Sequence, residues 1–325
     1  MRDKNSAIAP GSVALAESPA EPPVPSETDR RVAWRGTMLA ALGVLAFSMT
    51  FPGTVFAMRG FDPYLVAIGR AVLAAAVAAV CLLVARVPLL PPRRHLRSYI
   101  LTSLAVVFGF PLFSGLALYG GASTSHSAVV IGLLPAATAA FAVLRAGERP
   151  RPMFWVAGGL GAVSITVFTL GQGGGRLSVA DLLLVLALLS AGFGYTEGAK
   201  LSRETPGWRV ISYALVVAVP VSLPVTIVLA FTTEIRPSFE AFAGFAWVGV
   251  ISMFLGFVPW YAGLAMGGIA RAGQTQLLQP LLTLLWAWLL LSEDFGASTV
   301  VAALAVLVCV AATQRARIGA MPPRG

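Results

Sequence analysis

The chain has 325 residues, of which 57% are hydrophobic and only 11% are charged, with a formal net charge of +9. Soluble domains carry about 25% charged residues, so this composition excludes an ordinary soluble fold. Repeated apolar segments of roughly twenty residues indicate an integral α-helical membrane protein instead, and the alternating pattern of a membrane β-barrel is absent from the sequence.

Residues 1–33 are rich in Pro, Ala, Ser and Glu and lack helical periodicity, which is typical of a disordered tail. No short apolar segment with a cleavage site precedes the first span, so we expect that span to act as its own insertion signal. Residues 315–325 are expected to form a second tail.

Ten membrane spans follow in chain order, each long enough to cross a hydrocarbon core about 30 Å thick. Gly- and Pro-rich joints separate them. They are expected at residues 36–58, 63–85, 98–119, 123–145, 152–171, 179–200, 208–232, 241–264, 269–291 and 294–314.

The basic residues are sorted to one side of these spans. With the N-terminus inside, the predicted cytoplasmic segments hold nineteen of the 23 Lys and Arg, the opposite side holds three, and Arg70 lies inside a span. This asymmetry predicts both termini in the cytoplasm, in a cytoplasmic (inner) membrane. It also explains the net charge without nucleic-acid binding.

Two stretches resemble each other at a constant offset of 145 residues: LLPAATAAFAVLRAGE at 133–148 and LQPLLTLLWAWLLLSE at 278–293. Six of their sixteen positions are identical, including a proline, a threonine and a final glutamate. Because five predicted spans separate them, the two copies must cross the membrane in opposite directions. The sequence therefore predicts an all-α fold of two inverted five-helix repeats, residues 34–171 and 177–314.

The order and spacing of these motifs resemble the EamA-like, ten-helix exporter branch of the drug/metabolite transporter superfamily. The resemblance covers about residues 36–314, and it implies the same inverted repeats and the export of amino acids or related metabolites. Other members import, exchange or move lipid-linked groups. The first helix departs from the family, which often has Trp-Gly where this chain has Phe47-Ser48. The matching residues are Ala117-Leu118-Tyr119, Pro135 and Gly147-Glu148 in the first copy, Tyr261-Ala262, Gln279-Pro280 and Ser292-Glu293 in the second, and Asp62-Pro63 with Arg70.

Arg70 lies about two turns into the second span. A charge at that depth costs at least about 2.5–3.5 kcal/mol on insertion scales, so it must face protein or a water-filled cavity. It could attract an anionic group of a substrate, or it could bond helix-end carbonyls or a carboxylate and lock the bundle.

Polar and aromatic residues inside the spans are the candidates for a substrate path, although each could instead serve as an interhelical contact. They are Thr50, Arg70, Tyr119, Tyr195, Trp260, Tyr261, Gln276, Gln279 and Thr283. Three prolines remove backbone hydrogen bonds inside spans and are expected to act as hinges: Pro52, Pro135 and Pro280.

Two titratable residues could carry protons. Glu197 lies near the cytoplasmic end of the sixth span, where an ion pair with Lys200 is the alternative. His126 lies at the outer mouth of the fourth span, where a surface histidine is the alternative. Glu148 and Glu293, at span ends, are expected to hold turns or cap neighbouring helices.

These features favour a secondary transporter without cofactor or metal, because the chain has no phosphate-binding GxxxxGK[ST] loop and no room for a nucleotide-binding domain. The expected activity is proton- or exchange-driven export of a neutral, zwitterionic or drug-like solute by a monomer or homodimer. The alternatives are an importer or exchanger of organic anions or nucleotide-sugar-like solutes. An intramembrane enzyme or a receptor-like partner is disfavoured, since the sequence has only two histidines and no cluster of carboxylates.

Overall fold

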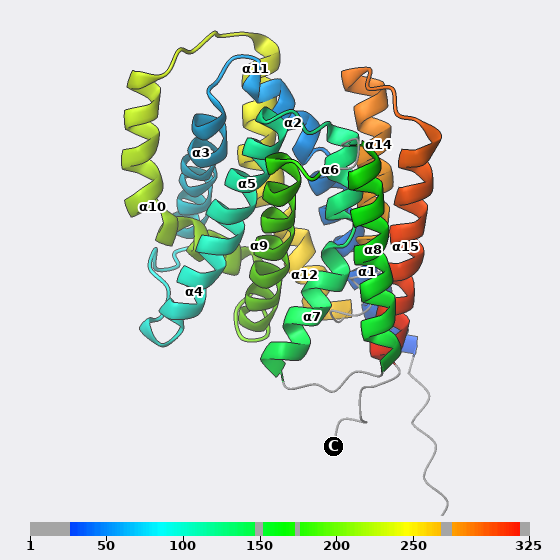
Figure 1. The fold of residues 1–325 in the computed structure, drawn as a ribbon. Helices are drawn as coiled ribbons and strands as arrows, with labels where there is room; N and C mark the ends of the chain where they lie inside the picture. The colour runs from blue at the N-terminus through cyan, green and yellow to red at the C-terminus, as the bar shows by residue number, and fades with distance from the viewer. Residues whose placement is uncertain (1–26, 147–151, 173–175, 268–274, 319–325) are drawn as a thin grey trace, which may run out of the picture.

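The computed structural model describes residues 27–146, 152–172, 176–267 and 275–318. The described residues form a bundle of antiparallel helices joined by short loops (Figure 1). Eight helical segments are long and apolar enough to cross a membrane, and two shorter apolar helices, Leu278–Leu291 and Ala297–Ala312, complete the ten spans. The start of the predicted ninth span, residues 269–274, lies outside the described residues.

The first repeat contains spans one to five, and three of these spans are made of more than one helical segment. Span one is α1 (Glu27–Ser48) and α2 (Thr50–Met58), and span two is α3 (Pro63–Val84). Span three is η1 (Arg93–His95), α4 (Leu96–Thr102), η2 (Ser103–Gly109) and α5 (Phe110–Tyr119). Span four is α6 (Thr124–Ile131) and α7 (Leu134–Ala146), and span five is α8 (Pro152–Gln172).

The second repeat contains spans six to ten. Spans six and seven are α9 (Val179–Leu201) and α10 (Gly207–Thr232). Span eight is α11 (Phe239–Ala246), η3 (Trp247–Leu255) and α12 (Phe257–Gly267). The described parts of spans nine and ten are α14 (Leu278–Leu291) and α15 (Ala297–Ile318).

At both ends of the bundle, a helix extends into a segment that was expected to be a tail. Helix α1 begins at Glu27, inside the segment expected to be disordered, although the apolar span itself begins at Trp34. An ion pair of 2.6 Å joins Arg31 to Glu27 one turn away. Extending an existing helix by a polar turn is cheap because no new nucleus is needed. Helix α15 likewise continues to Ile318, beyond the predicted boundary at 314.

Local capping explains where two of the spans begin. The Asp62 side chain accepts hydrogen bonds from the backbone N–H groups of Tyr64 and Leu65, and Pro63 occupies the first turn of α3. In α9, Ser178 and Asp181 form a reciprocal capping box. Both arrangements satisfy N–H groups that a helix leaves without partners at its start.

The two repeats share an irregularity that composition does not explain. Spans three and eight each contain a stretch of wide π-helical turns, η2 and η3. Moved by the 145-residue offset, Ser103–Gly109 falls on residues 248–254, which lie within η3. π-Helical turns are rare. Their occurrence at matching positions supports a duplicated origin for the two halves.

The packing of spans has the same symmetry. When the repeats are exchanged, span one (α1) takes the place of span six (α9), and span eight (α12) that of span three (α5). The contact between α1 and α12 therefore has a counterpart in the contact between α9 and α5. The pairs α3 with α10 and α8 with α15 correspond to themselves, and so does the pairing of span four with span nine, which are in contact through α6 and α14. Figure 1 shows α8 beside α15 at one side of the bundle and α3 beside α10 at the other. The contacts among the described parts of the ten spans therefore have the symmetry of two inverted repeats related by a pseudo-two-fold axis.

A glycine allows helices α1 and α12 to approach each other closely. A Cβ on Gly263 of α12 would lie 2.6 Å from the backbone nitrogen of Ala40 and 2.7 Å from the carbonyl oxygen of Gly36, both on α1. The α1–α12 contact between the repeats therefore requires glycine at position 263.

We expect Gly263→Ala to lower the melting temperature of the purified protein by several degrees, because overpacking typically costs about 1–3 kcal/mol. Gly159→Ala is the matched control: it lies on the exposed face of α8, where a Cβ would meet nothing within 4 Å. The control should be neutral or slightly stabilising, since Ala is the better helix former. Equal melting temperatures for both variants would contradict the packing argument.

Candidate functional site

A small cavity, lined mostly by buried side chains, lies between the two repeats. Its volume is about 30 Å³, enough for one or two water molecules. The first repeat provides Phe47, Thr50, Arg70, Val106, Phe110 and Leu134, and the second provides Ala191, Tyr195, Ser252, Met253, Phe257 and Gln279. Both repeats therefore contribute to its wall, and we refer to it as the central cavity.

Hydroxyl groups from opposite repeats meet at the polar side of the central cavity. The Thr50 and Ser252 hydroxyl oxygens lie 2.6 Å apart, so one donates a hydrogen bond to the other. Thr50 belongs to α2 and Ser252 to the π-helical η3. This hydrogen bond couples the break in span one to the irregular part of span eight.

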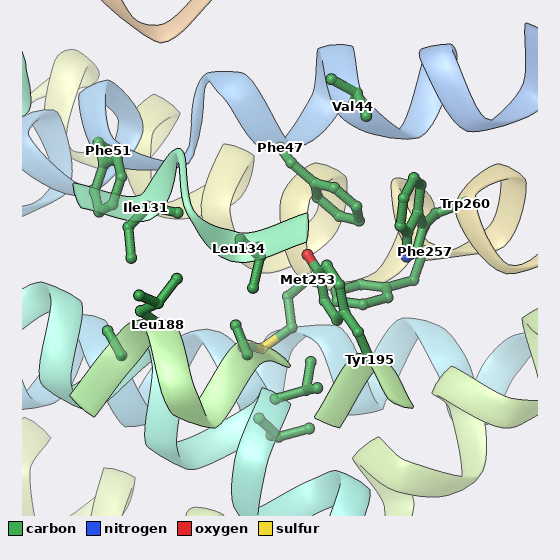
Figure 2. Close-up of a cluster of buried hydrophobic side chains, with 14 of the residues drawn as sticks. Val44, Phe47, Phe51, Ile131, Leu134, Leu188, Tyr195, Met253, Phe257 and Trp260 are labelled. Atoms are coloured by element: carbon green, nitrogen blue, oxygen red, sulfur yellow. The ribbon is translucent and has the colours of Figure 1, made fainter. Parts of the chain in front are cut away.

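Aromatic side chains form another part of the cavity's surroundings, which we call the aromatic wall. The rings of Phe47 and Phe257 have centroids 4.8 Å apart, and Tyr195 meets Phe257 edge-on at 5.8 Å. Trp260 is fully buried and its ring lies 6.1 Å from that of Phe47 and 5.7 Å from that of Tyr195. Figure 2 shows these four side chains gathered together, with Leu134 and Met253 beside them. The cavity is therefore mostly apolar, with a few polar groups, as small-molecule sites usually are.

A second, smaller cavity of about 10 Å³ lies between α6, α7 and α14 and shares Leu134 and Gln279 with the first. Both repeats are broken here. Helix α6 ends at Ile131 and α7 begins at Leu134, while a turn at Gln276 and Leu277 precedes α14. Pro135 and Pro280, each just after its break, both line this cavity, together with Gln276 and Thr283.

The break in span one is satisfied from the other repeat. Because Pro52 has no N–H group, the carbonyl of Ser48 four residues earlier loses its helical donor. The Thr283 hydroxyl of α14 donates to that carbonyl oxygen at 2.8 Å, and the Trp286 indole N–H donates to the Ser48 hydroxyl at 2.9 Å. Helix α14 therefore supplies the hydrogen bond that the interrupted first span lacks.

Glu293 caps a helix of the opposite repeat. Its carboxylate accepts hydrogen bonds from the backbone N–H groups of Thr124 and Ser125 at 3.0 and 2.9 Å and from the Ser125 hydroxyl at 2.7 Å. An acidic group at a helix N-terminus is favoured by the unpaired N–H groups and by the helix dipole. The capping role expected for Glu293 is confirmed, whereas Glu148 lies outside the described residues.

Spans four and six are joined by a polar side-chain contact at each end. At the end predicted to be cytoplasmic, Glu197 is 1% exposed and lies 2.8 Å from Arg145 and 3.5 Å from Lys200. At the opposite end, His126 lies 2.8 Å from Asp181 and stacks on Phe168. The His126 side chain is mostly buried, so it is not the surface histidine that was the alternative.

The structure brings together some of the predicted path residues and not others. Thr50, Arg70, Tyr195 and Gln279 line the central cavity, and Gln276 and Thr283 line the second cavity. Trp260 and Tyr261 are fully buried, Trp260 behind the aromatic wall. Tyr119 is 70% exposed at the end of α5 and lines neither cavity.

Sequence reasoning missed Ser252, which the structure places at the polar side of the cavity. Its signal was present: it is the one hydroxyl residue in the apolar stretch Trp247–Leu255. Phe47 was considered only as a departure from the family, and yet its ring forms part of the aromatic wall.

A larger apolar groove, about 600 Å³, opens on the outer surface between α1, η3, α12 and α14. Its wall includes Leu42, Leu45, Leu255 and Leu290, all of which are exposed at the surface of the bundle. Such a surface suits contact with lipid hydrocarbon, and the groove lacks the polar groups of the central cavity.

Inverted repeats and broken spans around a cavity between the halves are recurring features of membrane transporters. Comparisons with known proteins agree. The EamA-like transporter family model matches residues 34–170 and 178–313. An uncharacterized transporter of Bacillus subtilis (strain 168), YdeK, is 43% identical over 274 residues, covering 84% of this chain and 95% of that protein. The chain belongs to the EamA-like transporter family and is a membrane transporter of small solutes.

The fold also matches a solved crystal structure with a TM-score of 0.62. That match covers 86% of this chain and 98% of the solved chain, at 21% sequence identity. At this identity the likeness extends to the fold alone.

We expect Glu293→Gln to lower the melting temperature by several degrees, because hydrogen bonds to a charged group contribute about 1.5–3 kcal/mol each and the amide can accept only part of them. Glu234→Gln removes an acid from an exposed ion pair with Arg236 and serves as the control. Differential scanning fluorimetry of both variants tests this, and a Glu293→Gln protein as stable as the control would refute the cross-repeat cap.

Proposed function

We propose that this protein exports a small metabolite, amino-acid-like or otherwise neutral or zwitterionic, or a drug, across the cytoplasmic membrane by alternating access. The observation that carries the proposal is the central cavity, which both repeats line and which has a volume of about 30 Å³. A site shared by two inverted halves can be exposed to either side when one half rocks against the other.

The broken spans supply the moving parts of this mechanism. Helix breaks leave backbone groups unpaired, and lipid cannot satisfy them, so they occur where protein or a cavity does. The breaks before Pro135 and Pro280 face each other across the second cavity, next to the central one. Movement at these two breaks would open the central cavity by displacing Leu134 and Gln279, which line both cavities.

The direction and the energy source rest on the sequence. The loop charges support cytoplasmic termini, and the absence of a nucleotide-binding motif from the sequence supports coupling to an ion gradient or to exchange. A monomer or a homodimer is compatible with this mechanism, because the cavity is complete within one chain. Within the EamA-like family the resemblance favours export.

The polar contacts that join spans four and six have a place in the transport cycle. The Arg145–Glu197 pair joins α7 to α9 at the end predicted to be cytoplasmic, so it would have to break when the cavity opens between these helices. The His126–Asp181 pair would act in the same way at the outer end. In this proposal both contacts hold α9 against span four while the cavity is shut, and neither carries protons.

Reconstitution into liposomes tests the transport proposal. We expect the purified protein to accelerate the movement of at least one small zwitterionic or drug-like solute when a pH gradient or trans solute is imposed. Protein-free liposomes, and liposomes containing an unrelated membrane protein, provide the baseline. If no solute of a panel of amino acids, nucleobases and cationic drugs moves under any gradient, the proposal fails.

A Glu197→Gln variant separates closure from proton coupling. We expect it to keep pH-gradient coupling and to melt at a lower temperature, because Arg145 and Lys200 lose their partner. Glu204→Gln, at an exposed carboxylate near His95, is the control. Loss of gradient-driven transport together with intact solute exchange would instead identify Glu197 as the proton carrier.

Import or exchange of organic anions is the second candidate, and one observation favours its substrate class: the cavity contains a buried arginine, Arg70. Transport in liposomes with a defined protein orientation distinguishes export from import, since the favoured direction reverses.

A further inference from the structure

Arg70 is the most unusual polar group of the bundle. It lies in α3 and is 2% exposed, and its Nε atom is buried without a hydrogen-bond partner. Among the described residues, the structure records no ion pair, hydrogen bond or stacked ring for this guanidinium group. The alternative that Arg70 locks the bundle through a carboxylate or a helix-end carbonyl therefore finds no partner there.

A buried charge without a partner is costly in a protein interior and more so at membrane depth. Such a group is retained where it serves a ligand or a path. Arg70 lines the central cavity, to which both repeats contribute, so a ligand in that cavity could reach its charge.

The neighbours of Arg70 favour an anion over a cation. The lining residues of the central cavity include the hydroxyl groups of Thr50 and Ser252 and the amide of Gln279, and no aspartate or glutamate. Hydroxyl and amide groups can both donate hydrogen bonds to an acceptor. A guanidinium fork matches the two oxygens of a carboxylate and binds them in a bidentate way.

The aromatic wall of the cavity defines the rest of the ligand. Phe47, Tyr195 and Phe257 present aromatic rings, which suit an apolar or aromatic group and tolerate an ammonium group by cation–π attraction. With a volume of about 30 Å³ the cavity is smaller than such a ligand, so the wall has to widen when the ligand enters.

We propose that Arg70 binds the carboxylate of the transported solute, and that the substrate class is a carboxylic acid with an apolar or aromatic body. This inference rests on the proposed transport function and adds to it the group by which the solute is recognised.

The test uses the full-length protein in liposomes and three matched pairs of probes: alanine, leucine and phenylalanine, each with its amide. The amide keeps the body and the ammonium group and lacks only the anionic oxygen pair. We expect the wild-type protein to prefer at least one acid over its amide. Arg70→Gln should lower transport of that acid at least tenfold and leave the amide within twofold, so that the preference disappears.

Two further variants make the comparison specific. Arg70→Lys keeps the charge without the fork and should retain an intermediate preference. Arg59→Gln removes an arginine from the half-exposed pair with Glu240 outside the cavity and should leave the preference unchanged.

Thermal melting provides a readout that does not depend on transport. If Arg70 is a ligand site, Arg70→Gln removes an uncompensated charge and should melt at the same temperature as the wild type or higher. In addition, the preferred acid should raise the melting temperature of the wild type and not that of Arg70→Gln.

Several results would overturn the inference. The first is an equal loss of acid and amide transport in a destabilised Arg70→Gln protein. The second is a wild-type protein that prefers no acid over its amide. The third is stronger competition for transport by a phosphate monoester than by a carboxylate. If the wild type moves only solutes without an acidic group, the transport function stands and the role of Arg70 falls. If nothing moves at all, the transport function itself fails.

Discussion

The structure depends on one constraint: within the hydrocarbon of a bilayer, every backbone N–H and C=O group must find its partner inside the protein. An unbroken helix meets this requirement alone. In the described part of the chain, turns interrupt spans one, four, eight and nine, and the backbone groups freed at a turn need other partners. The Ser48 carbonyl, freed by Pro52, takes its hydrogen bond from Thr283 of the other repeat. The same hydrogen bond therefore satisfies the backbone carbonyl and joins the two repeats.

This arrangement also places the site. A helix break that is satisfied by a distant helix creates a small space with polar groups at its edge, and the central cavity lies among three such irregular segments: the α1–α2 break, the π-helical η3 and the break before α14. The two repeats are not equivalent in this respect, because α9, which corresponds to span one, runs without a break from Val179 to Leu201. The site is thus built from symmetric halves but is itself asymmetric.

Much of the fold could be predicted from the sequence, because it follows from long-range regularities. The apolar lengths gave the spans, and the offset of 145 residues gave the inverted repeat. Capping by Glu293 was also predictable in kind, since a glutamate ends an apolar run at a helix end. Its partner, Ser125, was not, because the pairing depends on the packing of α14 against α6.

The candidate site was less predictable for a physical reason. Whether a polar residue in a span faces a cavity or a neighbouring helix depends on helix rotation and on wide turns, and the π-helical stretches shift the facing of all later residues in their span. Ser252 faces the cavity from such a stretch. Tyr119 matches the family motif and yet is exposed at the end of α5. Trp260 lies near the site, but it packs against Phe47 and Tyr195 and does not line the cavity itself.

The cap on α6 has a consequence for how the protein is made. Ser125 and Glu293 are 168 residues apart, so the first repeat is completely synthesised long before its fourth span receives its carboxylate. At about 5–20 residues per second, that interval is on the order of ten to thirty seconds. During this time the N-terminus of α6 must rely on Ser123 and on water at the membrane surface. The nascent first half is consequently a membrane-inserted intermediate with an unfinished helix, which becomes a finished domain only when its inverted copy arrives.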